Sequence, residues 1–79
     1  MKAEKWNYSN ASYEECTLPD ECDTAVNNVI VCANCHKEFP ILVAYKSYEF
    51  RRLNGTRLPV CTDCFDVENT RRQIYYGNY

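Results

Sequence analysis

"VCANCHKEF" at residues 31–39 and "LPVCTDCF" at residues 58–65 each place two cysteines three positions apart. The pairs are Cys32 with Cys35 and Cys61 with Cys64, and 25 residues separate them. A CxxC turn brings two thiolates to one ion, and two such turns complete a tetrahedral site with no open position. A core in a chain of 79 residues usually needs an additional constraint. The spacing therefore predicts one zinc ion per chain as that constraint.

The same four thiols leave two alternatives open, which are structural disulfides and a redox-active dithiol. The residues after Met1 contain no apolar stretch that resembles a signal peptide, and the longest apolar run, "PILVAY" at 40–45, is too short to cross a bilayer. We therefore expect an intracellular protein of the cytoplasm or nucleus, without membrane association. Thiols in such reducing compartments bind metal more often than they form structural bridges.

The distribution of charge divides the chain into two parts. Residues 1–28 contain two lysines and six acidic residues, a formal charge of −4, and show no clear hydrophobic period. We expect an acidic, largely irregular leader there, followed at 29–79 by a four-cysteine zinc module with a formal charge of +2. A net charge of −2 and a pI near 5.3 argue against general attraction to nucleic acid.

The middle of the module has two interpretations. Asn54-Gly55 between apolar flanks is typical of a hairpin turn, but the same pair also ends helices. We favour a helix over 43–53, because Ile41, Tyr45 and Tyr48 would then share one face.

The ends of the module are easier to assign. Val29, Ile30 and Val31 predict a short strand that runs into the first cysteine pair. A second helix is predicted over 63–76, with N-capping by Thr62 or Asp63 and one face marked by Val67 and Ile74. The predicted fold class is a small, zinc-stabilised α+β domain.

The pattern "CANCHKEF…LPVCTDC" resembles the small "probable zinc-ribbon" domain family over about residues 29–72. The resemblance implies a zinc-ribbon or treble-clef-like fold with a C-terminal helix, the four cysteines as ligands and Phe39 as a core aromatic. The family usually has Gly where this chain has His36, and basic residues where this chain has "FDVEN" at 65–69. Small viral zinc proteins with two CxxC pairs also show a similar spacing.

Three further potential ligands lie outside the two cysteine pairs. Cys16 and Cys22 flank Pro19 in "ECTLPDEC", a spacing that fits a loop. They are candidates for a second metal site with His36, or for a disulfide with each other, or they have no task of their own. His36, beside a ligand cysteine, is expected to be solvated or to support the metal site from outside it, and the alternative is that it replaces a cysteine ligand.

Cationic and aromatic side chains predict a surface for a partner, and its members are Arg51, Arg52, Arg57, Arg71, Arg72, Tyr45, Tyr48 and Trp6. This combination suits a protein partner and also single-stranded nucleic acid. The alternative is that the tyrosines form a small core with the arginines as its solvated rim, paired with acids such as Glu49.

No catalytic constellation is evident in the sequence. We therefore expect a non-enzymatic zinc-binding adaptor that binds another macromolecule, with a protein of a transcription-regulating or other nucleic-acid machine as the first choice. Direct binding of single-stranded nucleic acid is the second hypothesis. A thiol redox protein is the third.

Overall fold

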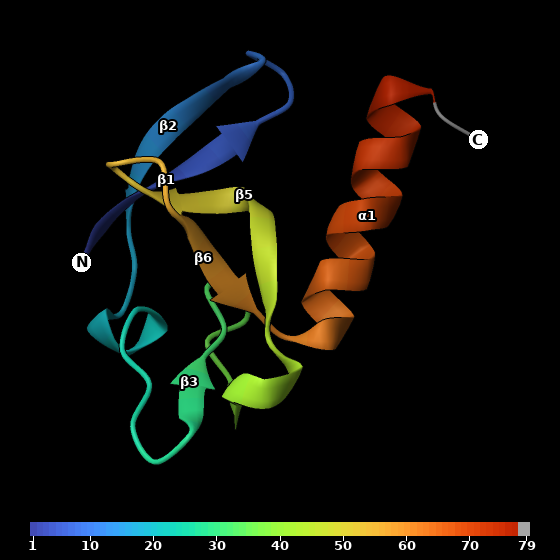
Figure 1. The fold of residues 1–79 in the computed structure, drawn as a ribbon. Coiled ribbons are helices and arrows are strands. Elements are labelled where there is room, and N and C mark those ends of the chain that lie inside the picture. Colours follow the sequence, from blue (N-terminus) through green and yellow to red (C-terminus); the bar gives the residue numbers. More distant parts are fainter. Residues whose placement is uncertain (78–79) are drawn as a thin grey trace.

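The computed structural model describes residues 1–77 of this chain as a small α+β fold (Figure 1). Four strands form an antiparallel sheet in the order β2-β1-β5-β6, and β3 and β4 form a separate two-stranded sheet. The bounds of the elements are β1 Lys2–Asn7, β2 Ser12–Thr17, η1 Asp20–Cys22, β3 Val29–Val31, β4 Glu38–Pro40, η2 Ile41–Val43, β5 Tyr45–Arg52, β6 Arg57–Val60 and α1 Thr62–Tyr76, where η marks a 3-10 helix.

The expected irregular leader is wrong, because β1 and β2 form a hairpin that belongs to the main sheet. Strand β1 pairs on its other side with β5, with Lys5 opposite Phe50. The strand pattern is hard to recognise because β2 is a polar edge strand, SYEECT, and only Ala3 of β1 is fully buried. A cross-strand pair of Trp6 and Tyr13, with ring centroids 5.0 Å apart, supplies apolar contact instead.

The predicted helix over 43–53 is also wrong, and the hairpin interpretation of this segment is confirmed. Strand β5 runs from Tyr45 to Arg52, and the chain turns at Asn54-Gly55 into β6. Gly55 has φ of 93°, a backbone conformation that glycine adopts without steric cost, and its N–H donates to the carbonyl of Arg52. Polar Ser47 and Glu49 are buried in β5, so the hydrophobic alternation expected of a central strand is missing.

Helix α1 confirms the predicted C-terminal helix, although it begins one residue earlier. The predicted N-cap at Thr62 or Asp63 is wrong, because Cys61 is the N-cap residue and makes no side-chain capping hydrogen bond. Gly77 ends the helix in the left-handed conformation. The predicted apolar face is wrong: Val67 and Ile74 are 49% and 61% exposed, whereas Cys64 and Glu68 are the buried residues of the helix. Within residues 1–77, no helix has the length and apolar character needed to cross a membrane.

The core is small and includes three cysteines. Its buried members are Ala3, Leu18, Cys22, Ile30, Cys32, Ala33, Phe39, Phe50, Leu58, Val60 and Cys64. The predicted strand at β3 and the predicted burial of Phe39 are both confirmed. Because Cys32 and Cys64 belong to this core, the packing of the fold and the geometry of the cysteine cluster depend on each other.

Candidate metal centre

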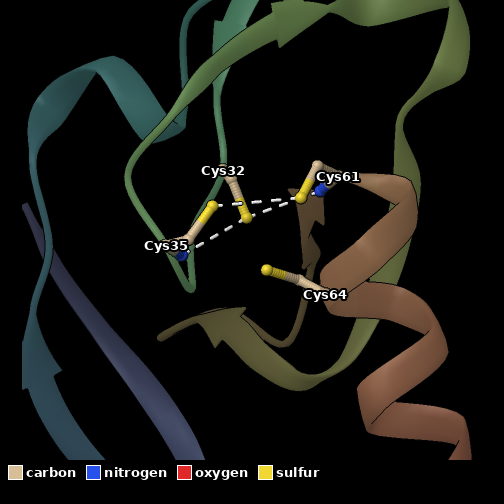
Figure 2. A group of neighbouring side chains, drawn as sticks. All are labelled: Cys32, Cys35, Cys61 and Cys64. Atoms are coloured by element: carbon tan, nitrogen blue, oxygen red, sulfur yellow. Dashed lines mark hydrogen bonds between the residues drawn. The ribbon is translucent and has the colours of Figure 1, made fainter.

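Two chain segments bring the four CxxC cysteines to one place. Cys32 and Cys35 lie in the turn that follows β3, while Cys61 precedes α1 and Cys64 lies in its first turn. A main-chain hydrogen bond of 3.0 Å from Ala33 N to Pro59 O joins the two segments. Figure 2 shows the four side chains pointing toward a common centre. Their Sγ atoms all lie within 4.8 Å of one another.

Hydrogen-bond donors are already directed at the sulfur of Cys32. The N–H groups of Asn34, Cys35 and Cys61 lie 3.4, 3.5 and 3.4 Å from it. Burial alone would raise the pKa of the Cys32 thiol, but these donors outweigh it and lower that pKa below its ordinary value. The turn therefore stabilises a thiolate, which is the form that binds metal.

Cys64 differs from Cys32 in its surroundings. Burial raises the pKa of its thiol to about 12, and the side-chain amide of Asn34, 3.3 Å from the sulfur, opposes that shift. Without a cation the Cys64 thiol thus stays protonated, and a bound cation would have to displace that proton.

The donor set fits a tetrahedral thiolate ion such as zinc. Four sulfurs at about 2.3 Å from a zinc ion lie about 3.8 Å apart. The sulfurs of Cys35 and Cys61 are 3.9 Å apart, and all four sulfurs lie within 4.8 Å of one another, so the cluster is close to this spacing. Four thiolates leave no coordination position for a substrate, which is the arrangement of structural sites.

The other predicted ligands do not join a second site. Within residues 1–77, the four cysteines form the one group of three or more metal-ligating residues with its ligand atoms close together. Cys16 and Cys22 are both free thiols. Cys16 is half-buried, whereas Cys22 is fully buried and its Sγ donates a 3.6 Å hydrogen bond to the carbonyl of Cys32.

His36 lies outside the cluster and is exposed, as expected. Its φ of 63° is in the left-handed region, and its N–H donates to the carbonyl of Cys32 at 3.0 Å. Glycine adopts this conformation more readily than histidine, so the turn holds His36 in a backbone conformation that is unfavourable for it.

The predicted cationic surface is only partly assembled, because three of its arginines pair with carboxylates. Arg51 pairs with Glu4, Arg52 with Asp23 and Arg71 with Glu49. The remaining two, Arg57 and Arg72, lie over the ring of Tyr48 at 5.3 and 3.9 Å from its centroid.

The predicted aromatic members divide between two groups. Tyr45 and Tyr48 both stack on Phe65 of α1, at centroid distances of 4.5 and 5.6 Å. Trp6 instead contacts Tyr13 and Tyr8 of the β1–β2 hairpin.

The sequence did not predict that the carboxylates of Glu68 and Glu49 are buried and join α1 to β5. Glu68 accepts hydrogen bonds from Ser47 Oγ at 2.6 Å and from Tyr48 N at 2.9 Å. Glu49 accepts two from Arg71. Glu49 was expected to pair with an arginine, but no signal in the sequence indicated that either glutamate is buried.

Comparison with known proteins does not assign a family or a function to this chain. A scan against protein-family models, a search of curated proteins and a search of solved structures each found no match. The likeness to the "probable zinc-ribbon" family therefore stays a prediction. The structure itself establishes a small α+β fold in which four cysteines lie close enough together to hold a metal ion.

Proposed function

We propose that this chain is a non-enzymatic zinc-binding adaptor that binds another protein. In this proposal Cys32, Cys35, Cys61 and Cys64 hold one zinc ion in a zinc-ribbon or treble-clef-like arrangement. The ion then fixes the turn after β3 against the start of α1, and it has a structural role because all of its coordination positions are filled.

The proposal that the partner is a protein rests on the exposure of the most apolar segment of the chain. In η2, Leu42 is 92% exposed, and its neighbours Ile41 and Val43 are exposed as well. Val29 is also exposed, and it pairs with Pro40 immediately before η2. Contiguous exposed apolar side chains are typical of protein interaction sites, since water solvates them poorly.

Nucleic-acid binding has weaker support. Phosphate contacts would come from arginines, but Arg51, Arg52 and Arg71 already pair with carboxylates. The net charge of −2 gives no long-range attraction to phosphate. A transcription or other nucleic-acid machine as the host rests on fold-level analogy, and a thiol redox function needs free CxxC thiols instead of a filled site.

The proposal is tested by affinity capture with the full-length, zinc-loaded chain and extract of the source organism, treated with nuclease. The bait variant Leu42→Asp removes the most exposed apolar side chain. Leu53→Asp is the matched control, because Leu53 is 52% exposed but lies in the β5–β6 turn. We expect Leu42→Asp to lose specific proteins that Leu53→Asp retains. Identical captured proteins for wild type and Leu42→Asp, or capture abolished by nuclease, would contradict the proposal.

A further inference from the structure

Two adjacent hollows lie beside the β1–β2 hairpin. The first has a volume of about 230 Å³ and is lined by Trp6, Tyr8, Tyr13, Tyr48, Arg72 and Tyr76. The second, of about 400 Å³, also uses Trp6 and Tyr8, and it extends past Lys5 and Arg71. Figure 1 shows the tip of the hairpin facing the C-terminal half of α1, where the rings of Tyr8 and Tyr75 are 4.8 Å apart. Together the two hollows form what we call the hairpin groove.

The walls of the hairpin groove are held in place by internal contacts. The hydroxyl of Tyr8 donates to Glu49 at 2.9 Å, and that of Tyr13 donates to the carbonyl of Tyr48 at 3.2 Å. The guanidinium of Arg72 lies 3.9 Å from the ring centroid of Tyr48. A groove whose side chains are already ordered loses less conformational entropy when it binds a ligand.

The charge of the groove favours an acidic ligand. Among residues 1–77, no carboxylate forms a salt bridge with Arg72 or Lys5. The lining holds three cationic side chains, Lys5, Arg71 and Arg72, against two carboxylates, those of Glu14 and Glu49. Glu49 is paired with Arg71, and Glu14 accepts from the amides of Asn7 and Asn10. An aromatic cage for a cation is excluded by the guanidinium in its wall, because like charges repel.

The shape of the groove favours a peptide over a nucleic acid. Bases bind by stacking on free ring faces. Tyr48 has Arg72 and Phe65 against its ring, and Arg51 lies 3.5 Å from the ring centroid of Tyr13. The rings of Trp6 and Tyr8 lie at 86° to each other, so they offer no parallel platform for successive bases, although each can contact an apolar side chain. What remains is two small hollows separated by Trp6 and Tyr8, each below or near the lower size limit of small-molecule sites. Such a pair of hollows suits successive side chains of an extended chain.

We propose that the hairpin groove binds an extended, proline-containing segment of a partner protein, with an acidic residue of that segment beside Arg72. Proline segments dock in aromatic-lined grooves because they are extended before binding, and their carbonyls need donors. Within residues 1–77, no acceptor is bonded to the indole N–H of Trp6 or the hydroxyls of Tyr48 and Tyr76. This inference rests on the proposed function, because it also requires a protein partner. It concerns a different surface from η2.

The test uses Trp6, the single tryptophan of the chain, as a reporter inside the groove. The full-length, zinc-loaded protein is titrated with a capped synthetic peptide of about ten residues in which prolines flank two aspartates. We expect a saturable change in Trp6 fluorescence. Arg72→Glu should weaken binding by about tenfold or more, and Arg72→Gln, which preserves length and polarity, should weaken it less. Lys46→Glu makes the same charge change at an exposed site away from the groove and should have no effect.

Circular dichroism and thermal melting of each variant establish that it is folded. Absence of a saturable change for the folded wild type would overturn the inference, as would equal binding by folded wild type and Arg72→Glu. Tighter binding of a lysine-substituted proline peptide or of an oligothymidylate would also overturn it. If the peptide fails while Leu42→Asp still abolishes protein capture, the adaptor proposal stands without the groove. If the peptide binds but Leu42→Asp does not change the captured proteins, peptide binding by the hairpin groove is supported and the proposed role of η2 is contradicted.

Discussion

Arg71 on α1 donates two hydrogen bonds, of 2.9 and 2.6 Å, to the carboxylate of Glu49 on β5. Glu49 is 1% exposed and also accepts a 2.9 Å hydrogen bond from Tyr8 at the end of the β1 hairpin. One buried carboxylate thus joins the helix, the central strand and the hairpin. The helix docks on the sheet through this polar contact as well as through the stacking of Phe65 on Tyr45 and Tyr48.

Removing the cation of this pair should destabilise the fold. Arg71→Ala leaves the Glu49 charge buried with one remaining donor, and we expect a loss of about 2 kcal/mol in the free energy of unfolding by urea denaturation. Arg71→Ala combined with Glu49→Gln should be less destabilised than Arg71→Ala alone, because the uncompensated charge is gone. Arg57→Ala, at an exposed position, should change stability by less than about 0.5 kcal/mol. Equal stability of Arg71→Ala and Arg57→Ala would contradict this account of the interface.

Deleting residues 1–17 should unfold the protein. The deletion removes two of the four strands of the main sheet and exposes the edge of β5. This edge includes Phe50, which pairs with Lys5 of β1 in the intact chain. We expect the truncated chain to lose the dispersed amide signals of a folded protein in a two-dimensional NMR spectrum. Retention of a native-like spectrum would show that the remaining residues fold without the hairpin.

The sequence predicted the parts of the fold that have a strong local signal. The paired cysteines indicated the cluster, and Thr62 and Asp63 marked the start of α1 to within one residue, although neither of them is the N-cap residue. It did not predict β5, because Ser47 and Glu49 occupy buried positions where alternation would require apolar residues. The partners that satisfy Glu49 are Tyr8 and Arg71, which are distant in sequence, and only the folded chain brings them together. The β1–β2 hairpin was not predicted for a similar reason, because it is stabilised by the pairing of β1 with β5.

Glu68 should make the stability of the fold depend on pH. Burial raises the pKa of its carboxyl, against the opposing effect of hydrogen bonds from Ser47 and Tyr48. Because the folded-state pKa lies above the unfolded one, the stabilising contribution is complete below the unfolded pKa and decreases as pH rises through the folded pKa. The difference in unfolding free energy between wild type and Glu68→Gln should therefore shift in favour of the variant as pH rises. Protonation of the cysteine cluster at low pH would affect both proteins alike, so a difference that does not vary with pH would contradict the assignment.

The two cysteines outside the cluster should respond differently to substitution. Cys22→Ser places a more polar hydroxyl in a fully buried position beside the carbonyl of Cys32, and we expect a loss of about 1 kcal/mol in unfolding free energy. Cys16→Ser, at a half-buried position, should change it by less than about 0.5 kcal/mol. Metal analysis of both variants should still give one ion per chain. Loss of the ion from either variant would show that its thiol is a ligand.

X-ray absorption at the zinc edge, combined with metal analysis of the purified protein, determines whether Cys32, Cys35, Cys61 and Cys64 hold a zinc ion. The account predicts one zinc ion per chain with four sulfur neighbours at about 2.3 Å. It also predicts that Cys61→Ser lowers the sulfur count or abolishes metal binding together with folding. A folded chain with no metal and four free thiols would contradict it, as would an ion bound through nitrogen or oxygen ligands.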